Sequence, residues 1–375
     1  MSAPLSPLVA LPGAVALGAR SLVLVGDVLA RLGDVPDGSV RCVVTSPPYL
    51  DGRDYAVAPT TWPAVTYRPR FDLPEVTVPA EAACLGREAT LLAYVGHLVL
   101  VFRELRRVLR SDGVVWLNLA AGYSSGTTAP RKPTTTEGGR VPASWKGRCY
   151  GARVTAGLPA KQLISAPPAV ADALQAEGGA RHWYLRDHVA WHKPNATPSS
   201  VDDRCTPAWE HLYLFSRSPR YALRLERIAT PAKYARSGNA ARAHGENRDD
   251  AGNHRGTSVP WQGDVAHPRN VWSIPTEGYS GRHTATFPTE LARRCVIAGS
   301  DPGDVVLDPF AGTGTAVCVA DHLGRAGLGV EAQPDCAGEL LARLADTAER
   351  LAVQPPAPPA LGGDGPLFTA RTRKP

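Results

Sequence analysis

The stretch Val305–Thr315, VVLDPFAGTGT, carries an apolar run through a glycine-rich turn into the start of a helical pattern. The glycines of such a turn let the backbone approach a ligand closely, and the helix that follows presents free N–H groups. Glu331 stands at the end of the next predicted strand, Gly327–Val330, where a carboxylate can bind two ribose hydroxyls. The stretch therefore predicts a parallel α/β sheet that binds a cofactor containing adenosine.

Two other kinds of glycine-loop site fit this stretch less well. A P-loop is excluded because no Gly-Lys-Ser/Thr sequence follows the turn. A dinucleotide fingerprint is weak because Val317 stands where the third glycine belongs. For this segment taken alone, a plain strand–turn–helix corner without a ligand remains an alternative.

The N-terminal part of the chain repeats the alternation of strand and helix. Leu22–Val25 is predicted as a strand, Val28–Leu32 as a short helix and Arg41–Val44 as a buried strand. This order is the βαβ signature of a parallel sheet.

The clearest predicted helix is Leu91–Arg110, whose apolar residues fall on one stripe. We expect Gly113 to end this helix and Val114–Leu119 to follow as a strand. Further elements are expected as a helix at about 161–177, strands at about 184–191 and 210–216, a helix from Pro288 to Ala298, strand Val305–Leu307 and helix Ala316–Leu323.

Long polar stretches interrupt these elements. Residues 51–90 contain many prolines and are expected to be irregular. Residues 122–160 and 226–268 combine Arg and Lys with Gly and other polar residues. Because they are too long for ordinary connections, we expect functional loops or disordered insertions.

The composition limits the class of protein. With 43% apolar residues the 375-residue chain is not wholly disordered, and its net charge of +6 permits an anionic partner. Seven scattered cysteines indicate neither a disulfide framework nor a zinc cluster, so we expect no metal. The longest apolar stretch, Leu91–Phe102, is too short to span a bilayer. We therefore expect a soluble cytoplasmic protein that binds no membrane.

A second motif, Thr45-Ser46-Pro47-Pro48-Tyr49, follows the buried strand, at the sheet edge where open α/β folds bind ligands. The two prolines fix the backbone, so the Pro47 carbonyl is a stiff acceptor beside the Ser46 hydroxyl. An exocyclic amino group on a nucleobase needs two such acceptors, and the base needs a ring such as Tyr49 to stack on. A Pro-Pro turn without a binding role is the alternative.

Together the two motifs resemble those of S-adenosylmethionine-dependent DNA amino-methyltransferases of the β order, in which Ser/Asp-Pro-Pro-Tyr precedes the glycine loop. Other segments resemble that family in the same order: Gly26-Asp27, 102–119, 186–201, 206–218, 270–275 and 283–291. The likeness covers about residues 20–335.

The resemblance implies an α/β, Rossmann-like methyltransferase fold with a mostly parallel sheet and helices on both faces. It also implies circular permutation, with the catalytic half before the cofactor half, and irregular DNA-recognition insertions. The implied divisions are an N-terminal arm (1–20), a catalytic half (21–225) with loop insertions 51–90 and 122–160, a target-recognition region (226–268), a cofactor-binding half of the same domain (269–352) and a disordered tail (353–375).

The resemblance also assigns roles to residues. The catalytic residues it implies are Ser46, Pro47, Pro48 and Tyr49. The residues it implies for binding S-adenosylmethionine are Asp27, Thr45, His283, Thr284, Phe287, Pro288, Asp308, Pro309, Phe310, Gly312, Gly314, Thr315 and Glu331. From the residues alone, His283 could equally pack in the core, and Lys193 and Asn195 could line the site or shape a loop.

The implied reaction is methylation of an exocyclic amino group in double-stranded DNA, on a base flipped into the pocket. Ser46 favours cytosine N4, because serine is more usual at that position in cytosine-N4 enzymes and aspartate in adenine-N6 enzymes. Adenine N6 is the main alternative, and a DNA-binding protein that has lost catalysis is a weaker one. An enzyme acting on glutamine in proteins is disfavoured, because such enzymes carry Asn-Pro-Pro-Tyr after the glycine loop. A homodimer, a separate cognate restriction endonuclease and action at the bacterial nucleoid are compatible with the resemblance.

Overall fold

The computed structural model describes residues 11–17, 20–50, 57–124, 158–199, 201–231, 265–277 and 288–333, together with Thr347. Three predicted cofactor residues, His283, Thr284 and Phe287, lie outside this set. So do the tail, most of 122–160 and most of 226–268. The predictions for these segments stay predictions.

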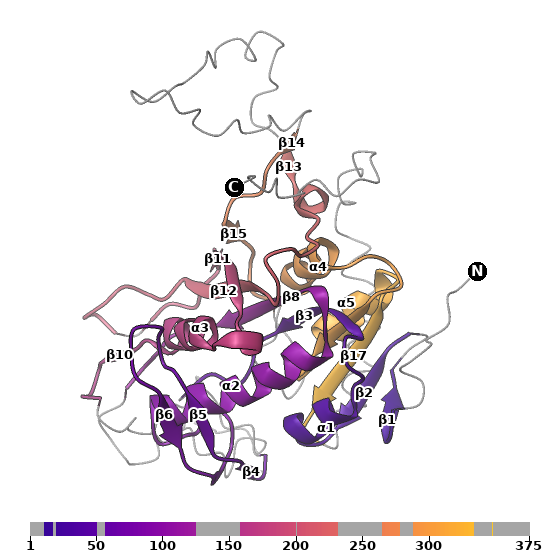
Figure 1. Ribbon diagram of the computed structural model, residues 1–375. Coiled ribbons are helices and arrows are strands. Elements are labelled where there is room, and N and C mark those ends of the chain that lie inside the picture. Colours follow the sequence, from indigo (N-terminus) through magenta and orange to yellow (C-terminus); the bar gives the residue numbers. More distant parts are fainter. Residues whose placement is uncertain are drawn as a thin grey trace, which may run out of the picture.

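A nine-stranded sheet forms the centre of the described structure (Figure 1). Its order is β1–β2–β17–β16–β3–β8–β12–β11–β15. The strands are β1 (Ala14–Ala16), β2 (Leu22–Val25), β3 (Val40–Thr45), β8 (Leu109–Leu119), β11 (Tyr184–His192), β12 (Trp209–Ser216), β15 (Val271–Ser273), β16 (Val305–Asp308) and β17 (Ala326–Glu331). The five strands from β2 to β8 in this order are parallel. Two strands from the C-terminal part of the chain, β16 and β17, thus lie between β2 and β3.

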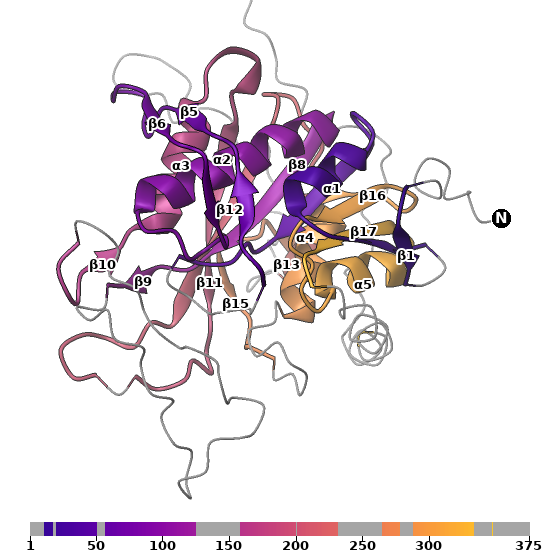
Figure 2. The same ribbon diagram turned by 90° about the horizontal axis from the view of Figure 1, so that it is seen from below.

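Helices cover both faces of the sheet, as Figures 1 and 2 show from two directions. On one face lie α1 (Val28–Asp34), α2 (Leu91–Val108) and α3 (Ala166–Ala176), and on the other lie α4 (Thr289–Gly299) and α5 (Thr315–His322). Each face has its own apolar core. The expected mostly parallel α/β architecture with two covered faces is confirmed. None of the described helices is long and apolar enough to cross a membrane.

Several predicted boundaries differ from the observed ones. Helix α2 ends at Val108 rather than at Arg110, and β8 begins at Leu109. Gly113, expected to end the helix, lies inside β8, where a Cβ would meet Leu109 Cγ at 2.7 Å. Crowding by a neighbouring side chain, and not helix termination, therefore explains this glycine.

The expectation that residues 51–90 are irregular is wrong for the described part, 57–90. It contains two antiparallel ladders, β4 (Thr60–Trp62) with β7 (Glu81–Ala83) and β5 (Val65–Tyr67) with β6 (Val76–Val78). These strands pack on α2, where Gly96 allows the close approach of Val65, Tyr67 and Val78. We call residues 57–90 the wall segment.

Short elements complete the description. They are the ladders β9 (Gly122–Tyr123) with β10 (Leu163–Ile164) and β13 (Thr230–Pro231) with β14 (Val265–Ala266), and the 3-10 turns η2 (Gly179–Arg181) and η3 (Leu225–Ile228). The first of these ladders and η2 flank α3, so the helix expected at 161–177 is shorter than predicted.

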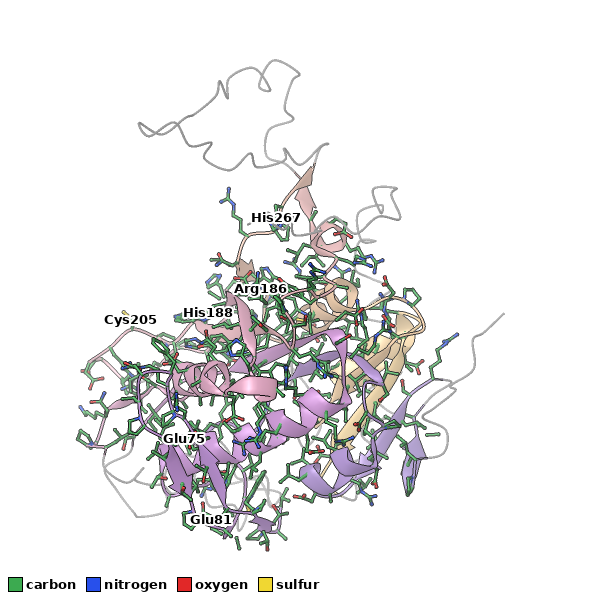
Figure 3. All side chains as sticks on the ribbon, viewed as in Figure 1. Glu75, Glu81, Arg186, His188, Cys205 and His267 are labelled. Atoms are coloured by element: carbon green, nitrogen blue, oxygen red, sulfur yellow. The ribbon has the colours of Figure 1, made fainter. Side chains whose placement is uncertain are left out.

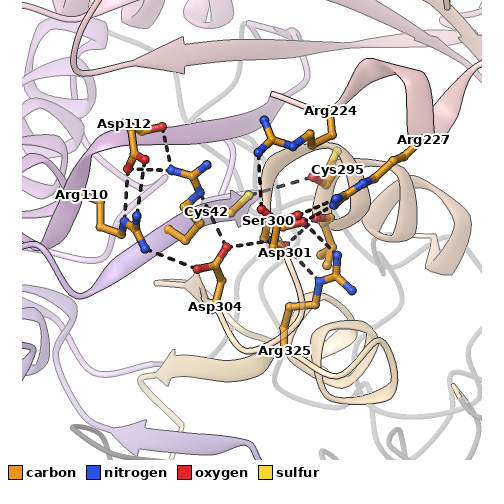
Figure 4. A network of polar contacts seen from close by, with 12 residues as sticks. Cys42, Arg110, Asp112, Arg224, Arg227, Cys295, Ser300, Asp301, Asp304 and Arg325 are labelled. Atoms are coloured by element: carbon orange, nitrogen blue, oxygen red, sulfur yellow. Dashed lines mark hydrogen bonds and ion pairs between the residues drawn. The ribbon is translucent and has the colours of Figure 1, made fainter. Parts of the chain in front are cut away.

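The amino ends of the parallel strands carry a network of arginines and aspartates (Figure 4). Arg41, at the start of β3, is buried and contacts Asp112 at 2.6 Å and Asp304 at 3.7 Å. Asp301 contacts Arg227 at 2.6 Å and Arg224 at 3.7 Å. We call this set the amino-edge network.

Candidate active site

A pocket opens at the opposite edge, where the parallel strands end. Strand β16 continues into α5 on one face of the sheet, whereas the chain after β3 returns through α2 on the other face. Such a reversal leaves a crevice at the carboxyl ends of the strands, where open α/β sheets bind ligands. The pocket lies in this position, with walls from the ends of β2, β3, β16 and β17 and from the wall segment.

Many of the predicted site residues line this one pocket. They are Asp27, Ser46, Pro48, Asp308, Pro309, Phe310, Gly312, Thr315 and Glu331. The wall segment adds residues that the sequence did not indicate, namely Val57, Ala58, Thr60, Trp62, Cys84, Leu85 and Arg87. The glycine turn and the Ser-Pro-Pro-Tyr motif, far apart in sequence, therefore open on a common space.

Five predicted site residues occupy other positions. Thr45 is buried at the end of β3, below the pocket floor. Gly314 caps α5 with φ 74°, a left-handed conformation that favours glycine. Pro288 is buried and caps α4, and Pro47 and Tyr49 are not among the lining residues.

Glu331 is fixed against the glycine turn. Its Oε2 accepts a hydrogen bond from the Gly312 N–H at 2.8 Å, and its Oε1 accepts one from the Gln333 N–H at 3.0 Å. Gly312 has φ 52°, so the turn depends on a residue that tolerates positive φ. The carboxylate is thus oriented at the pocket by the backbone.

Asp27 lies at the neighbouring strand end. Its Oδ1 caps α1 by accepting hydrogen bonds from the N–H groups of Leu29 and Ala30 at 3.0 and 3.1 Å. The Gly26 N–H donates to the Glu331 carbonyl at 2.9 Å, which ties the two acidic positions together. Asp27 and Glu331 therefore lie at the ends of two neighbouring strands, β2 and β17.

Asp308 connects the two motifs. The Thr45 hydroxyl donates to Asp308 Oδ1 at 2.7 Å across 263 residues of sequence, and the Phe310 N–H donates to the same oxygen at 3.1 Å. Burial raises the pKa of Asp308 to about 7, the two hydrogen bonds oppose this, and the charge of Glu331 adds to it. The buried Asp308 carboxyl therefore ionises less readily than an exposed aspartate.

The residues that hold Tyr49 were missed by the sequence analysis. The Tyr49 hydroxyl lies 2.8 Å from Asn118 Oδ1 and 2.9 Å from Glu210 Oε2. Lys193 donates a hydrogen bond to the other oxygen of Glu210. The sequence offers one signal for these residues, because Glu210 is a charged residue near the start of the mostly apolar strand β12. The residues that Glu210 contacts depend on strand register, which the local pattern does not give.

The structure separates the roles of Lys193 and Asn195, and a residue of α2 contacts the catalytic loop. Asn195 exchanges two hydrogen bonds with the backbone of Thr276, so it shapes a loop. Lys193 instead lies beside the residues that hold Tyr49. From α2, the Tyr94 hydroxyl donates to the Pro48 carbonyl at 3.0 Å.

The pocket fits a positively charged ligand with an adenosine group. Three acidic residues, Asp27, Asp308 and Glu331, line it, and their carboxyls take the hydrogen bonds described above from backbone N–H groups and Thr45. S-Adenosylmethionine carries a sulfonium and an ammonium group besides its ribose. Acidic groups and close-lying backbone N–H donors therefore match this cofactor in charge and in hydrogen bonding.

Comparisons with known proteins agree with this geometry. The family model described as DNA methylase, N6_N4_Mtase, matches residues 40–338. The type II methyltransferase M.Cfr9I of Citrobacter freundii is 34% identical over 310 residues, which cover 83% of each chain. The type II methyltransferase M.XycI of Xanthomonas campestris pv. cyanopsidis is 35% identical over 317 residues, or 84% of each chain.

Among solved structures, PvuII DNA methyltransferase (cytosine-N4-specific) superposes with a TM-score of 0.54 at 16% identity. The match covers 89% of this chain and 93% of that one. It confirms the Rossmann-like methyltransferase fold. With the family match over most of the chain and the site at the strand ends, the chain belongs to the DNA methylase family N6_N4_Mtase, whose members use S-adenosylmethionine as methyl donor.

Proposed function

We propose that this protein methylates the exocyclic N4 amino group of cytosine in double-stranded DNA, as the modification enzyme of a type II restriction-modification system. The observation that carries the proposal is that Ser46 and Pro48 line the same pocket as Asp308, Gly312 and Glu331. A serine in this motif is typical of cytosine-N4 enzymes. The type II relatives at 34% and 35% identity support the biological context.

The cofactor half of the pocket would hold S-adenosylmethionine. Glu331 would accept hydrogen bonds from the ribose hydroxyls, and Asp27 would lie on the adenine side; both line the pocket, which supports these roles. The backbone of the Asp308–Thr315 turn would approach the rest of the molecule, with Phe310 in contact. When bound, the cofactor supplies an electrophilic methyl group.

The catalytic loop would bind the amino group that is methylated. The Ser46 hydroxyl and the Pro47 carbonyl would accept its hydrogen bonds and stabilise the positive charge that develops on nitrogen. Tyr49 would stack on the flipped base, with a cation–π contribution as charge develops. Asn118 and Glu210 support this role because they fix the far end of the tyrosine ring.

DNA contacts outside the pocket fall to basic segments of the chain. We assign them to residues 122–160 and 226–268, where Arg and Lys suit phosphate contacts and Arg and Asn suit base edges. Deleting 236–256 should lower DNA affinity and its salt dependence while leaving cofactor affinity unchanged. An unchanged salt slope in binding assays would contradict this assignment.

The decisive test is mass spectrometry of nucleosides from unmethylated phage DNA incubated with enzyme and S-adenosylmethionine. We expect N4-methylcytosine from the wild type and none from the double variant Ser46→Ala, Tyr49→Ala. The matched control is Ser39→Ala, Tyr221→Ala, which removes the same side chains outside the pocket and should keep activity.

Each other outcome has a defined meaning. N6-Methyladenine as the product would refute the cytosine assignment and leave the family unchanged. Wild-type activity in the Ser46, Tyr49 double variant would show that the catalytic pocket lies elsewhere. Absence of any product from the wild type on several DNAs, together with tight DNA binding, would favour a binding protein without catalysis.

A further inference from the structure

A fully buried hydrogen-bonded pair of side chains lies behind the pocket. Glu88, in the wall segment, and His97, on α2, are both inaccessible at their side chains, and His97 Nδ1 lies 2.9 Å from Glu88 Oε1. Burying a carboxylate and an imidazole away from water is costly, and apolar residues of similar size could fill the space. Packing alone therefore does not account for this pair, and the catalytic residues of the proposed function do not include it.

One oxygen of Glu88 holds the backbone that touches the catalytic loop. The Gly86 N–H donates to Glu88 Oε2 at 2.8 Å. Gly86 has φ 84°, and a Cβ there would lie 2.8 Å from the Tyr49 carbonyl oxygen and 3.2 Å from Pro48 Cβ. The backbone at Gly86 thus lies directly against the Pro48–Tyr49 backbone, at a separation that only glycine allows.

The other partner, His97, holds the aromatic residue of the wall. The Trp62 ring stacks on the His97 ring with centroids 4.5 Å apart and planes 14° apart. The Trp62 indole N–H donates to the Ala83 carbonyl at 3.1 Å, and Trp62 lines the pocket.

A second carboxylate reaches the same imidazole. Glu81, opposite Trp62 in the β4–β7 ladder and labelled in Figure 3, has Oε1 3.6 Å from His97 Nε2. Trp62 of β4 and Glu81 of β7 thus both lie against His97 of α2.

The cofactor half of the pocket is supported differently. Glu331 and Asp308 are held by hydrogen bonds from the glycine turn, from Gln333 and from Thr45, which belong to or follow β16, β17 and β3. Glu88 and His97 instead contact the wall segment, which adjoins the catalytic loop. The two halves of the pocket thus have separate supports.

We propose that Glu88 and His97 are positioning residues for methyl transfer: they press Gly86 against the catalytic loop and fix Trp62 in the pocket wall. They thereby set the base-binding half of the pocket and leave the cofactor half unaffected. The inference rests on the proposed function, in which Ser46–Tyr49 receives the target base. A misplacement of about 1 Å in such a loop is enough to slow a reaction about a hundredfold.

The test compares Glu88→Ala with Glu88→Gln and with a control that, like Glu88→Ala, breaks a side-chain pair with a residue of α2. The control is Glu177→Ala, which breaks the partly buried, two-hydrogen-bond pair of Glu177 with Arg103 of α2, outside the pocket lining. For each protein we would measure transfer of tritiated methyl groups to phage DNA against DNA concentration, cofactor dissociation by calorimetry, and thermal melting.

We expect Glu88→Ala to lower kcat about a hundredfold with cofactor affinity within about threefold of the wild type. Glu88→Gln keeps an acceptor for Gly86 and should recover kcat to within about fivefold. Glu177→Ala should lower the melting temperature like Glu88→Ala and keep kcat. If Glu88→Ala does not fold, His97→Gln, which keeps Glu88 but removes the ring under Trp62, is tested by the same criteria.

Two results would overturn the inference. One is a loss of kcat in Glu88→Ala, or in its substitute His97→Gln, no larger than that in Glu177→Ala. The other is a parallel loss of cofactor affinity, which would mean that the pair supports the whole pocket. Failure of the proposed function is separate, because it would appear as wild-type activity in the Ser46→Ala, Tyr49→Ala variant.

Discussion

Acidic residues lie at the amino edge and at the carboxyl edge of the central sheet, that is, at the two ends of its parallel strands. Their partners differ between the two edges. At the amino edge, Asp112, Asp301 and Asp304 each contact arginines at 2.6 to 3.7 Å. At the carboxyl edge, Asp308 and Glu331 accept hydrogen bonds from a hydroxyl and backbone N–H groups and line a pocket. Acids paired with cations inside the protein stabilise the fold, whereas acids held only by neutral donors can attract a cationic ligand.

The pKa values of the two edges move in opposite directions. Burial disfavours ionisation of Asp112 and Asp301, but hydrogen bonds and charges from Arg41 and Arg227 outweigh it, so both pKa values lie below the usual value. At Asp308 burial dominates, and the pKa rises to about 7. Displaced carboxyl pKa values therefore occur at both edges, lowered at Asp112 and Asp301 and raised at Asp308.

The largest effect that would test this comparison is the pH dependence of Asp308. Because its folded pKa exceeds the usual 3.8, its contribution to stability is full below about pH 4 and is lost as pH rises through about 7. At about 1.4 kcal/mol per unit, the loss is on the order of 4 kcal/mol. Asp308→Asn keeps the acceptor oxygen and should flatten this fall in urea unfolding of the cofactor-free protein between pH 5 and 8. An Asn variant that keeps the wild-type slope would contradict the assignment.

The next effect concerns the amino edge. Arg41→Ala should lower the free energy of unfolding by about 3 kcal/mol, since it breaks a buried pair whose partner Asp112 still reaches water. Turnover per folded molecule should not change, because the network lies away from the pocket. Arg68→Ala, which breaks an exposed contact with Glu75 at 3.9 Å, is the matched control and should cost almost nothing. If Arg41→Ala lost kcat at a temperature where it is folded, the amino edge would also affect turnover, and the contrast drawn between the two edges would be wrong.

A smaller effect is expected at Glu331. Glu331→Ala removes the oriented carboxylate of the cofactor half and should weaken S-adenosylmethionine binding by about 1.5–3 kcal/mol. Calorimetry measures this directly, with Glu226→Ala as an acidic control at the other edge. An unchanged dissociation constant would remove Glu331 from the site.

The smallest effect is expected at the hydroxyl of Tyr49. Tyr49→Phe keeps the ring but loses the contacts with Asn118 and Glu210. The activation free energy should rise by about 1 kcal/mol, so kcat should fall roughly fivefold. Tyr67→Phe loses a comparable hydrogen bond, to the Leu92 carbonyl, and is the control that should keep kcat. Equal rates for Tyr49→Phe and the wild type would show that the ring needs no such support.

The elements around the glycine turn were largely predictable because their signals are local. Strand β16, the turn, helix α5 and strand β17 follow one another in sequence, and their predicted bounds differ from the observed ones by one residue. Glu331 could be named because its place is set by the strand that precedes it. The identities of these residues, and not only their apolar pattern, specify the turn.

The surroundings of the Ser46–Tyr49 loop were only partly predictable because they are assembled from distant segments. Three-residue strands such as β4 and β5 give too short an alternation to detect, so the sequence predicts irregular structure for the wall segment. Glu210 and Asn118 meet Tyr49 only through the antiparallel register of β8 and β12, which no local pattern encodes. The Glu88–His97 pair likewise appears only when the wall segment is packed on α2.

The position of β16 and β17 between β2 and β3 has a consequence for biosynthesis. Leu307 pairs with Val43, and Glu331 pairs with Val25, so the centre of the sheet closes through contacts that span most of the chain. Pairings of such high contact order form late and slowly. While the ribosome is still translating, β2 and β3 have no neighbour on their facing edges, and Asp308 is not yet available to Thr45. A growing chain therefore cannot complete the pocket, and methylation competence should arise only after synthesis has passed β17.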